Sequence, residues 1–246
     1  MTYFLIALMY LFGNIVEIIS GFGSTIVTVS LGANIYPIDK IIFALFPLGI
    51  TSNTYLVTRY RKHIDFKTLT KEILPLMGFG FLLGIYILSS FPISSLKNVY
   101  GVLILLLGIR GLYQNILKHN EINKPISNNI SAVFIFLSGI VQGLYSSGGP
   151  LLVYGLSSKN IDKDKFRVTL SIVWLFFSIL LFSFYLITGK SDIKDLNLTL
   201  YLIPSLIIGI VVGEKVHHKI NERYFKILIF SILLLAGISL TLAKNK

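Results

Sequence analysis

The stretch EIISGFGST, Glu17 to Thr25, places one carboxylate and a glycine-rich backbone inside an otherwise uncharged run. Glu17 is the only charged side chain among the first 38 residues. Both features are costly at membrane depth, because a charge and unpaired backbone amides lose their contact with water there. We therefore interpret the stretch as a functional break in a membrane-embedded segment.

The whole chain has the composition of a polytopic, all-α membrane protein. Hydrophobic residues make up 54% of its 246 positions and charged residues 13%, with 22 Lys and Arg against 11 Asp and Glu. A helix needs about 17 to 25 predominantly apolar residues to cross the hydrocarbon core. On this basis we predict six membrane-spanning helices, at 38–60, 68–92, 95–117, 163–189, 196–215 and 221–243.

Several function classes are disfavoured by composition. The basic residues lie in short segments between the predicted spans, which argues against nucleic-acid binding, since that function needs a contiguous basic face. The absence of cysteine excludes disulfides, thiol catalysis and cysteine metal sites. We expect no cofactor and no metal, and we interpret the four histidines as solvated cytoplasmic charges at loops or span ends: His63, His119, His217 and His218.

The sequence indicates a tandem duplication. The segment LPLMGFGFLLGI at 74–85 aligns with IPSLIIGIVVGE at 203–214, with one proline and two glycines in register. Upstream, Ser20 and Gly23 of the break SGFGST at 20–25 align with Ser146 and Gly149 of the break YSSGGP at 145–150. We predict one membrane domain built from two repeats and a polar linker, with boundaries at 1–117, 118–127 and 128–243.

The distribution of positive charge predicts orientation. Short cytoplasmic loops are enriched in Lys and Arg, and sixteen of the 22 such residues lie in four segments, at 59–71, 110–124, 159–167 and 215–226. Placing these segments inside sends matching spans of the two halves in opposite directions, the inverted-topology repeat of many secondary transporters. Both termini are then predicted to lie outside, in a multi-pass protein of the plasma membrane.

Each predicted repeat begins with a segment that does not fit a simple span. Residues 1–36 and 128–158 are too long for one perpendicular crossing and too short for two. We expect a re-entrant hairpin, or two short helices broken in the middle, followed in each repeat by three transmembrane helices. The N-terminal run lacks a basic region ahead of it, so we expect no cleaved signal peptide.

The two breaks are predicted to hold a small anion between them. A helix that starts after a break presents unpaired N–H groups and a partial positive charge, and glycine lets its backbone approach a ligand. The candidate substrate-binding residues in the breaks are Ser20, Gly21, Phe22, Gly23, Ser24, Thr25, Tyr145, Ser146, Ser147, Gly148 and Gly149. Polar side chains in neighbouring spans add Thr51, Asn53, Thr169 and Ser171.

Two further residues are candidates for coupling. Glu17 lies three residues before the first break, and carboxylates within membranes usually face a cavity or a partner. It either carries a coupling proton, bonds the substrate in its neutral form, or lies at headgroup level. Gln142 is its uncharged counterpart in the second repeat.

The repeated motifs resemble a known family. SGFGSTIVTVSLG in the first half and SGIVQGLYSSGGPLLVYGL in the second resemble the TauE/SafE family of sulfite exporters, and the likeness extends over nearly the whole chain. It implies a secondary transporter of small sulfur-containing anions such as sulfite, sulfoacetate and related sulfonates. The family's glycine motifs map to Gly21, Gly23, Gly148, Gly149 and Pro150. The chain departs from the family by carrying Ser24, Thr25 and Ser147 where smaller residues or glycine are common.

Two rival functions compete with proton-coupled transport. An intramembrane serine hydrolase needs a base within hydrogen-bond reach of its serine, and no histidine is predicted at that depth. We therefore predict that the protein is not an enzyme. A passive anion channel stays open as the alternative, because opposed re-entrant breaks also build pores.

Overall fold

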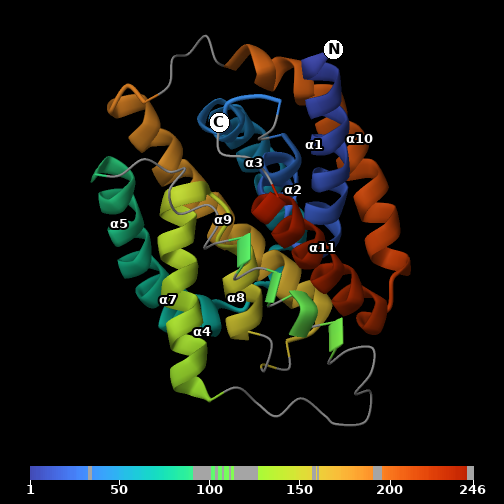
Figure 1. The fold of residues 1–246 in the computed structure, drawn as a ribbon. Helices are drawn as coiled ribbons and strands as arrows, with labels where there is room; N and C mark the ends of the chain where they lie inside the picture. The colour runs from blue at the N-terminus through green and yellow to red at the C-terminus, as the bar shows by residue number, and fades with distance from the viewer. Residues whose placement is uncertain are drawn as a thin grey trace. The chain divides into compact units, whose positions relative to one another are not determined.

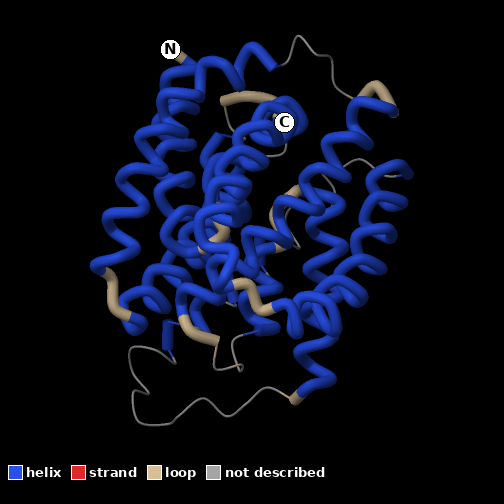
Figure 2. Tube along the Cα trace, turned by 180° about the vertical axis from the view of Figure 1, so that it is seen from behind, coloured by secondary structure: helices blue, strands red, loops and turns tan. Residues whose placement is uncertain are grey.

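The computed structural model describes residues 1–32, 35–90, 101–102, 105–106, 108–110, 112–113, 127–156, 159, 161–190 and 196–242. The regular elements in these parts are helices, drawn in Figures 1 and 2. They are α1 (Thr2–Ser20), α2 (Ser24–Gly32), α3 (Ile38–Tyr60), α4 (Phe66–Thr68), α5 (Leu74–Ser90), α7 (Asn128–Tyr145), α8 (Gly149–Leu156), α9 (Lys163–Ile187), α10 (Asn197–Lys219) and α11 (Glu222–Leu242). A 3₁₀ turn at Arg61–His63 follows α3, and a π turn at Leu69–Ile73 joins α4 to α5.

The polytopic helical class is confirmed. Among the described residues, six helices are long and apolar enough to cross a membrane, at Thr2–Ser20, Ile38–His63, Phe66–Ser90, Asn128–Tyr145, Lys163–Ile187 and Asn197–Lys219. Four of them coincide with predicted spans, and α11 coincides with a fifth. The predicted span at 95–117 lies mostly outside the described residues. Large apolar side chains such as Phe79 and Leu82 on α5 are exposed, as expected for a surface in contact with lipid tails.

The chain divides into two compact units. Unit 1 comprises Met1–Asp65 and Asp164–Ile220, and unit 2 comprises Phe66–Lys163 and Asn221–Asn245. Each unit therefore takes helices from both halves of the sequence. The repeat boundaries and the inverted orientation of the repeats remain predictions.

In unit 1, α1 packs lengthwise against α10, and the two helices lie side by side in both views (Figures 1 and 2). Two glycines on α10 allow this approach. A Cβ at Gly213 would stand 2.6 Å from Cβ of Ile18, and one at Gly209 would collide with the Asn14 amide. Small residues at four-residue spacing bring membrane helices into close van der Waals contact in this way.

Unit 2 repeats the arrangement with α5 and α7. Gly80 and Gly84 on α5 face Gly139 and Gly143 on α7, and a Cβ at Gly143 would stand 2.7 Å from the Phe81 carbonyl oxygen. A Cβ at Gly80 would collide with the Phe136 carbonyl oxygen. The glycine spacing in α5 and α10 thus serves helix packing.

The leading segment of each half is an unequal hairpin. Helix α1 has 19 residues and α2 nine, while α7 has 18 and α8 eight. At about 1.5 Å per residue the first arm reaches about 28 Å, nearly a full span, so the break follows this arm and does not divide the segment in the middle. The rings of Tyr3 and Tyr36 lie 5.9 Å apart, so the first hairpin begins and ends at the same end of unit 1. The re-entrant form of the prediction fits this geometry.

Candidate functional site

The break in unit 1 is a tight backbone turn. Gly21 directly follows α1 and adopts the left-handed region with φ 83°, and its N–H donates to the Glu17 carbonyl at 2.7 Å. Gly23 follows with φ 122°, and α2 begins at Ser24. The buried hydroxyl of Ser20 lies 2.8 Å from the carbonyl oxygens of Val16 and Phe22. Glycine is needed at both positive-φ positions because a Cβ would be strained there.

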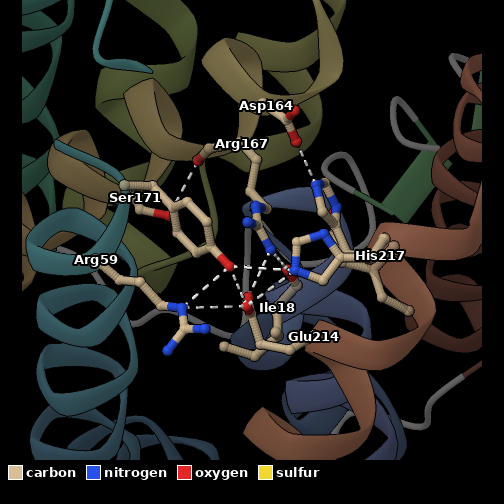
Figure 3. Close-up of polar contacts among 10 residues, drawn as sticks. Ile18, Arg59, Asp164, Arg167, Ser171, Glu214 and His217 are labelled. Atoms are coloured by element: carbon tan, nitrogen blue, oxygen red, sulfur yellow. Dashed lines mark hydrogen bonds and ion pairs between the residues drawn. The ribbon is translucent and has the colours of Figure 1, made fainter. Parts of the chain in front are cut away.

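Side chains from α9 and α10 hold the carbonyl groups at this break. Nη1 of Arg167 donates to the Ile18 carbonyl at 2.9 Å (Figure 3). Nδ1 of His217 donates to the Ile19 carbonyl at 2.7 Å. Nε1 of Trp174 donates to the Gly21 carbonyl at 2.7 Å. The last carbonyls of a helix have no partner within the helix, so these three donors satisfy groups that the break would leave unpaired.

Arg167 is the centre of a charged cluster (Figure 3). Its Nη1 also donates to Oε1 of Glu214 at 2.8 Å, and the ring of Tyr60 lies 4.5 Å from the guanidinium carbon. Oε2 of Glu214 accepts from the Tyr60 hydroxyl and lies 3.8 Å from Nε of Arg59. The neighbouring side chains of His217 and Asp164 are joined at 2.6 Å. We use the name Arg167 cluster for these two residues together with Arg59, Tyr60, Arg167 and Glu214.

The guanidinium of Arg167 is only partly satisfied. The side chain has 0% exposure, yet Nε and Nη2 have no hydrogen-bond partner. A buried donor without a partner costs about 1–3 kcal/mol, and more when it is charged. These two nitrogens are therefore hydrogen-bond donors that a ligand at the break could use.

A second polar group lines one face of α1. Tyr10, Asn14 and Glu17 are spaced four and three residues apart, so they share a face of the helix. Oε1 of Glu17 accepts from Nδ2 of Asn53 at 2.8 Å, and the backbone of Ser24 at the start of α2 also bonds the Glu17 carboxylate. All four side chains are buried. The hydroxyl of Tyr10, both polar atoms of Asn14 and Oδ1 of Asn53 have no hydrogen-bond partner.

The break in unit 2 is held by side chains of its own hairpin. Helix α7 ends at Tyr145 and is followed by Ser146, which has φ 52°; the backbone N–H of Gly148 donates to Oε1 of Gln142 at 3.0 Å. The Ser138 hydroxyl donates to the Gly148 carbonyl at 2.8 Å. Pro150 lies in the first turn of α8, where its missing N–H costs nothing. Gln142 thus fixes the turn as an uncharged acceptor.

The remaining sequence candidates fall into different environments. The break residues are buried except Gly23 and Thr25, which are half-buried. Thr51 is exposed and donates to the Pro47 carbonyl of its own helix at 2.7 Å, and the Ser171 hydroxyl donates to the Arg167 carbonyl at 3.0 Å. Oγ1 of Thr169 accepts from the Asp65 backbone at 2.9 Å. Among the candidates in the neighbouring spans, which are Thr51, Asn53, Thr169 and Ser171, Asn53 is the one with a hydrogen bond to Glu17 in the described part of the chain.

Sequence reasoning missed most of the Arg167 cluster. Arg167 was counted with the cytoplasmic segment 159–167, but it lies within α9 and is fully buried. The interpretation of His217 as a solvated charge is wrong, since its exposure is 0% and both ring nitrogens are bonded. Both residues lie in basic segments of the sequence, and that position does not reveal that packing against α1 buries their side chains. The face of α1 shared by Tyr10, Asn14 and Glu17 was readable from their spacing.

A comparison with protein-family models matches residues 5–240, nearly the whole chain, to the family described as sulfite exporter TauE/SafE. The chain belongs to the TauE/SafE family. This membership and the six span-length helices of the described part make it a multi-pass membrane protein of a transporter family. No curated protein and no solved structure matches this TauE/SafE chain.

Proposed function

We propose that this TauE/SafE protein is a proton-coupled secondary transporter of small sulfur-containing anions, such as sulfite and sulfonates, in the plasma membrane with both termini outside. The observation that carries the proposal is the buried break of unit 1, where α2 starts beside a carboxylate held by Asn53. Transporters commonly aim the N-terminus of a broken helix at an anionic substrate. We assign the anion to the glycine and serine break of unit 1, and the break at 145–150 stays a predicted substrate-binding element.

Glu17 is the proposed proton carrier. It is 4% exposed, and the donors that bond its carboxylate are the neutral Asn53 amide and the Ser24 backbone. The negative charge of Glu17 competes with an anion for the amides and partial positive charge at the start of α2. Protonation removes that competing charge, so anion binding and proton binding favour each other. This reciprocity is the basis of the proposed coupling.

Gln142 has a different part in the proposal. Its carboxamide accepts from the Gly148 amide and carries no charge that a proton would change. We therefore place the coupling step at Glu17 alone and give Gln142 the task of holding the second break in shape.

Uptake into liposomes tests the function. The purified chain is reconstituted, and uptake of radiolabelled sulfite is followed with and without a pH gradient, with sulfonates, thiosulfate and sulfate as unlabelled competitors. One pH unit corresponds to about 1.4 kcal/mol per proton, so one coupled proton sustains about tenfold accumulation. Equilibration without accumulation would favour a passive channel, and the absence of any sulfite flux through folded protein would remove this substrate class.

The Glu17→Gln variant tests the coupling. The amide keeps the size and the polar contacts of the side chain but cannot carry the proton, so we expect the about tenfold accumulation to disappear while exchange of sulfite across the membrane continues. Glu72→Gln is the matched control, because Glu72 lies in unit 2 and pairs with Lys159 at a partly exposed site. Accumulation by Glu17→Gln at the level of the unmodified protein would show that the proton is carried elsewhere.

A further inference from the structure

The unpartnered edge of Arg167 has the shape of an oxyanion receptor. In a planar guanidinium, Nε–H and one Nη2–H point in the same direction and match two oxygens bound to one atom. These are the two nitrogens of Arg167 that lack a partner, and both are fully buried. The other nitrogen, Nη1, makes the bonds to Ile18 and Glu214.

The structural contacts of Arg167 do not account for this edge. One nitrogen makes both polar bonds, and a lysine ammonium has enough donors to make the same two. The ring of Tyr60 covers a face of the guanidinium and makes no hydrogen bond with its edge. The contacts of Arg167 with Ile18, Glu214 and Tyr60 therefore leave its Nε and Nη2 donors unused.

The charged groups beside Arg167 pair with one another and leave its edge unused. Arg59 and Arg167 both face one carboxylate, Glu214, while the carboxylate of Asp164 is bonded to His217. The two guanidinium groups are thus matched by two carboxylates, and recognition of an anion depends on the unpaired Nε and Nη2 donors of Arg167.

We propose that Nε and Nη2 of Arg167 bind the transported anion by donating to two oxygens on its sulfur or carboxyl atom. The inference rests on the proposed function and names the residue that recognises the substrate. Because Nη1 stays on the Ile18 carbonyl, the anion is held by the same side chain that holds the end of α1. Substrate binding and the geometry of the break are thereby linked through one residue.

Direct binding measurements test this assignment. Sulfite is titrated by calorimetry into the detergent-solubilised full chain, into Arg167→Lys and into Arg61→Lys. Lysine keeps the charge and a donor for Glu214 but lacks the two-nitrogen edge, so we expect about 10- to 100-fold weaker binding in Arg167→Lys. Arg61 is exposed in the turn that follows α3 and is not part of the Arg167 cluster, so its variant should bind within about threefold of the unmodified protein.

A measurement on the unmodified protein covers the case in which Arg167→Lys does not fold. Crystals are soaked with selenite, a close analogue of sulfite, and the selenium is located by its anomalous signal. A peak within hydrogen-bond reach of Nε and Nη2 supports the assignment, and a peak confined to another place overturns it.

The outcomes separate this inference from the function on which it rests. Equal sulfite affinity in Arg167→Lys and the unmodified protein would overturn the role of Arg167 and leave the transport proposal standing. A lack of binding of sulfite and sulfonates by the unmodified, folded chain would overturn both.

Discussion

Replacing Gly80 by alanine is expected to destabilise the fold of this TauE/SafE protein strongly, whereas Gly78→Ala on the same helix is expected to be tolerated. A Cβ at Gly80 would collide with the Phe136 carbonyl and stand 3.1 Å from the Ile140 nitrogen, both backbone atoms of α7. Backbone atoms cannot rotate away, so α5 and α7 must separate. Overpacking of a tight contact typically costs about 1–3 kcal/mol of folding free energy. We expect a cost at the upper end of this range, because the two helices touch through glycines along their length.

Gly78 provides the matched comparison. No atom lies within 4 Å of a Cβ built there, so alanine adds only its higher helix propensity, worth up to about 1 kcal/mol. The folded fraction is measured by size-exclusion chromatography in detergent, and stability by thermal unfolding. Equal profiles for the two variants would show that α5 and α7 tolerate a wider separation.

Gly21→Ala is expected to damage the break in unit 1 and to reduce sulfite transport at least about tenfold. Alanine in the left-handed region costs about 1–2 kcal/mol. In addition, its Cβ would lie 2.6 Å from the Arg167 carbonyl oxygen and 2.8 Å from the Arg167 Cα. The first turns of α9 must then move, which weakens the bonds of Arg167 to Ile18 and of Trp174 to Gly21, at about 0.5–1.5 kcal/mol each. A change of 1.4 kcal/mol is about tenfold in an equilibrium constant.

Gly189 separates backbone strain from this collision. It also has a positive φ, 65°, but a Cβ there would meet no atom within 4 Å. Gly189→Ala therefore bears the strain alone and should lower the unfolding temperature slightly while transport continues. Transport and thermal unfolding are measured for both variants, and equal losses would contradict the importance of the contact between Gly21 and Arg167.

The positions of the helices and of the breaks were predictable because their causes are local. Lipid cannot bond to backbone groups, so apolar runs of sufficient length form helices wherever they occur. The break residues were predictable for a similar reason, since Gly21 and Gly23 adopt conformations that other residues avoid. The structure ends α1 at Ser20 and starts α2 at Ser24, inside the predicted break at 20–25.

The packing partner of the first hairpin was not predictable in the same way. Segments 1–20 and 24–32 are both apolar, and nothing in them specifies which distant helix they contact. The position of the break relative to the rest of unit 1 depends on which helix α1 packs against. That helix is α10, almost two hundred residues away along the chain.

The sequence by itself determined that this protein is a helical membrane protein with two polar breaks, because hydrophobic length and glycine conformation are properties of short segments. Only the tertiary structure decided which charges are buried. Arg167 and His217 lie in segments whose basic composition is typical of cytoplasmic loops, yet both contact the end of α1. The physical reason is that burial depends on contacts between distant segments: the free carbonyl groups at the broken end of α1 require donors, and packing of α9 and α10 beside α1 supplies them.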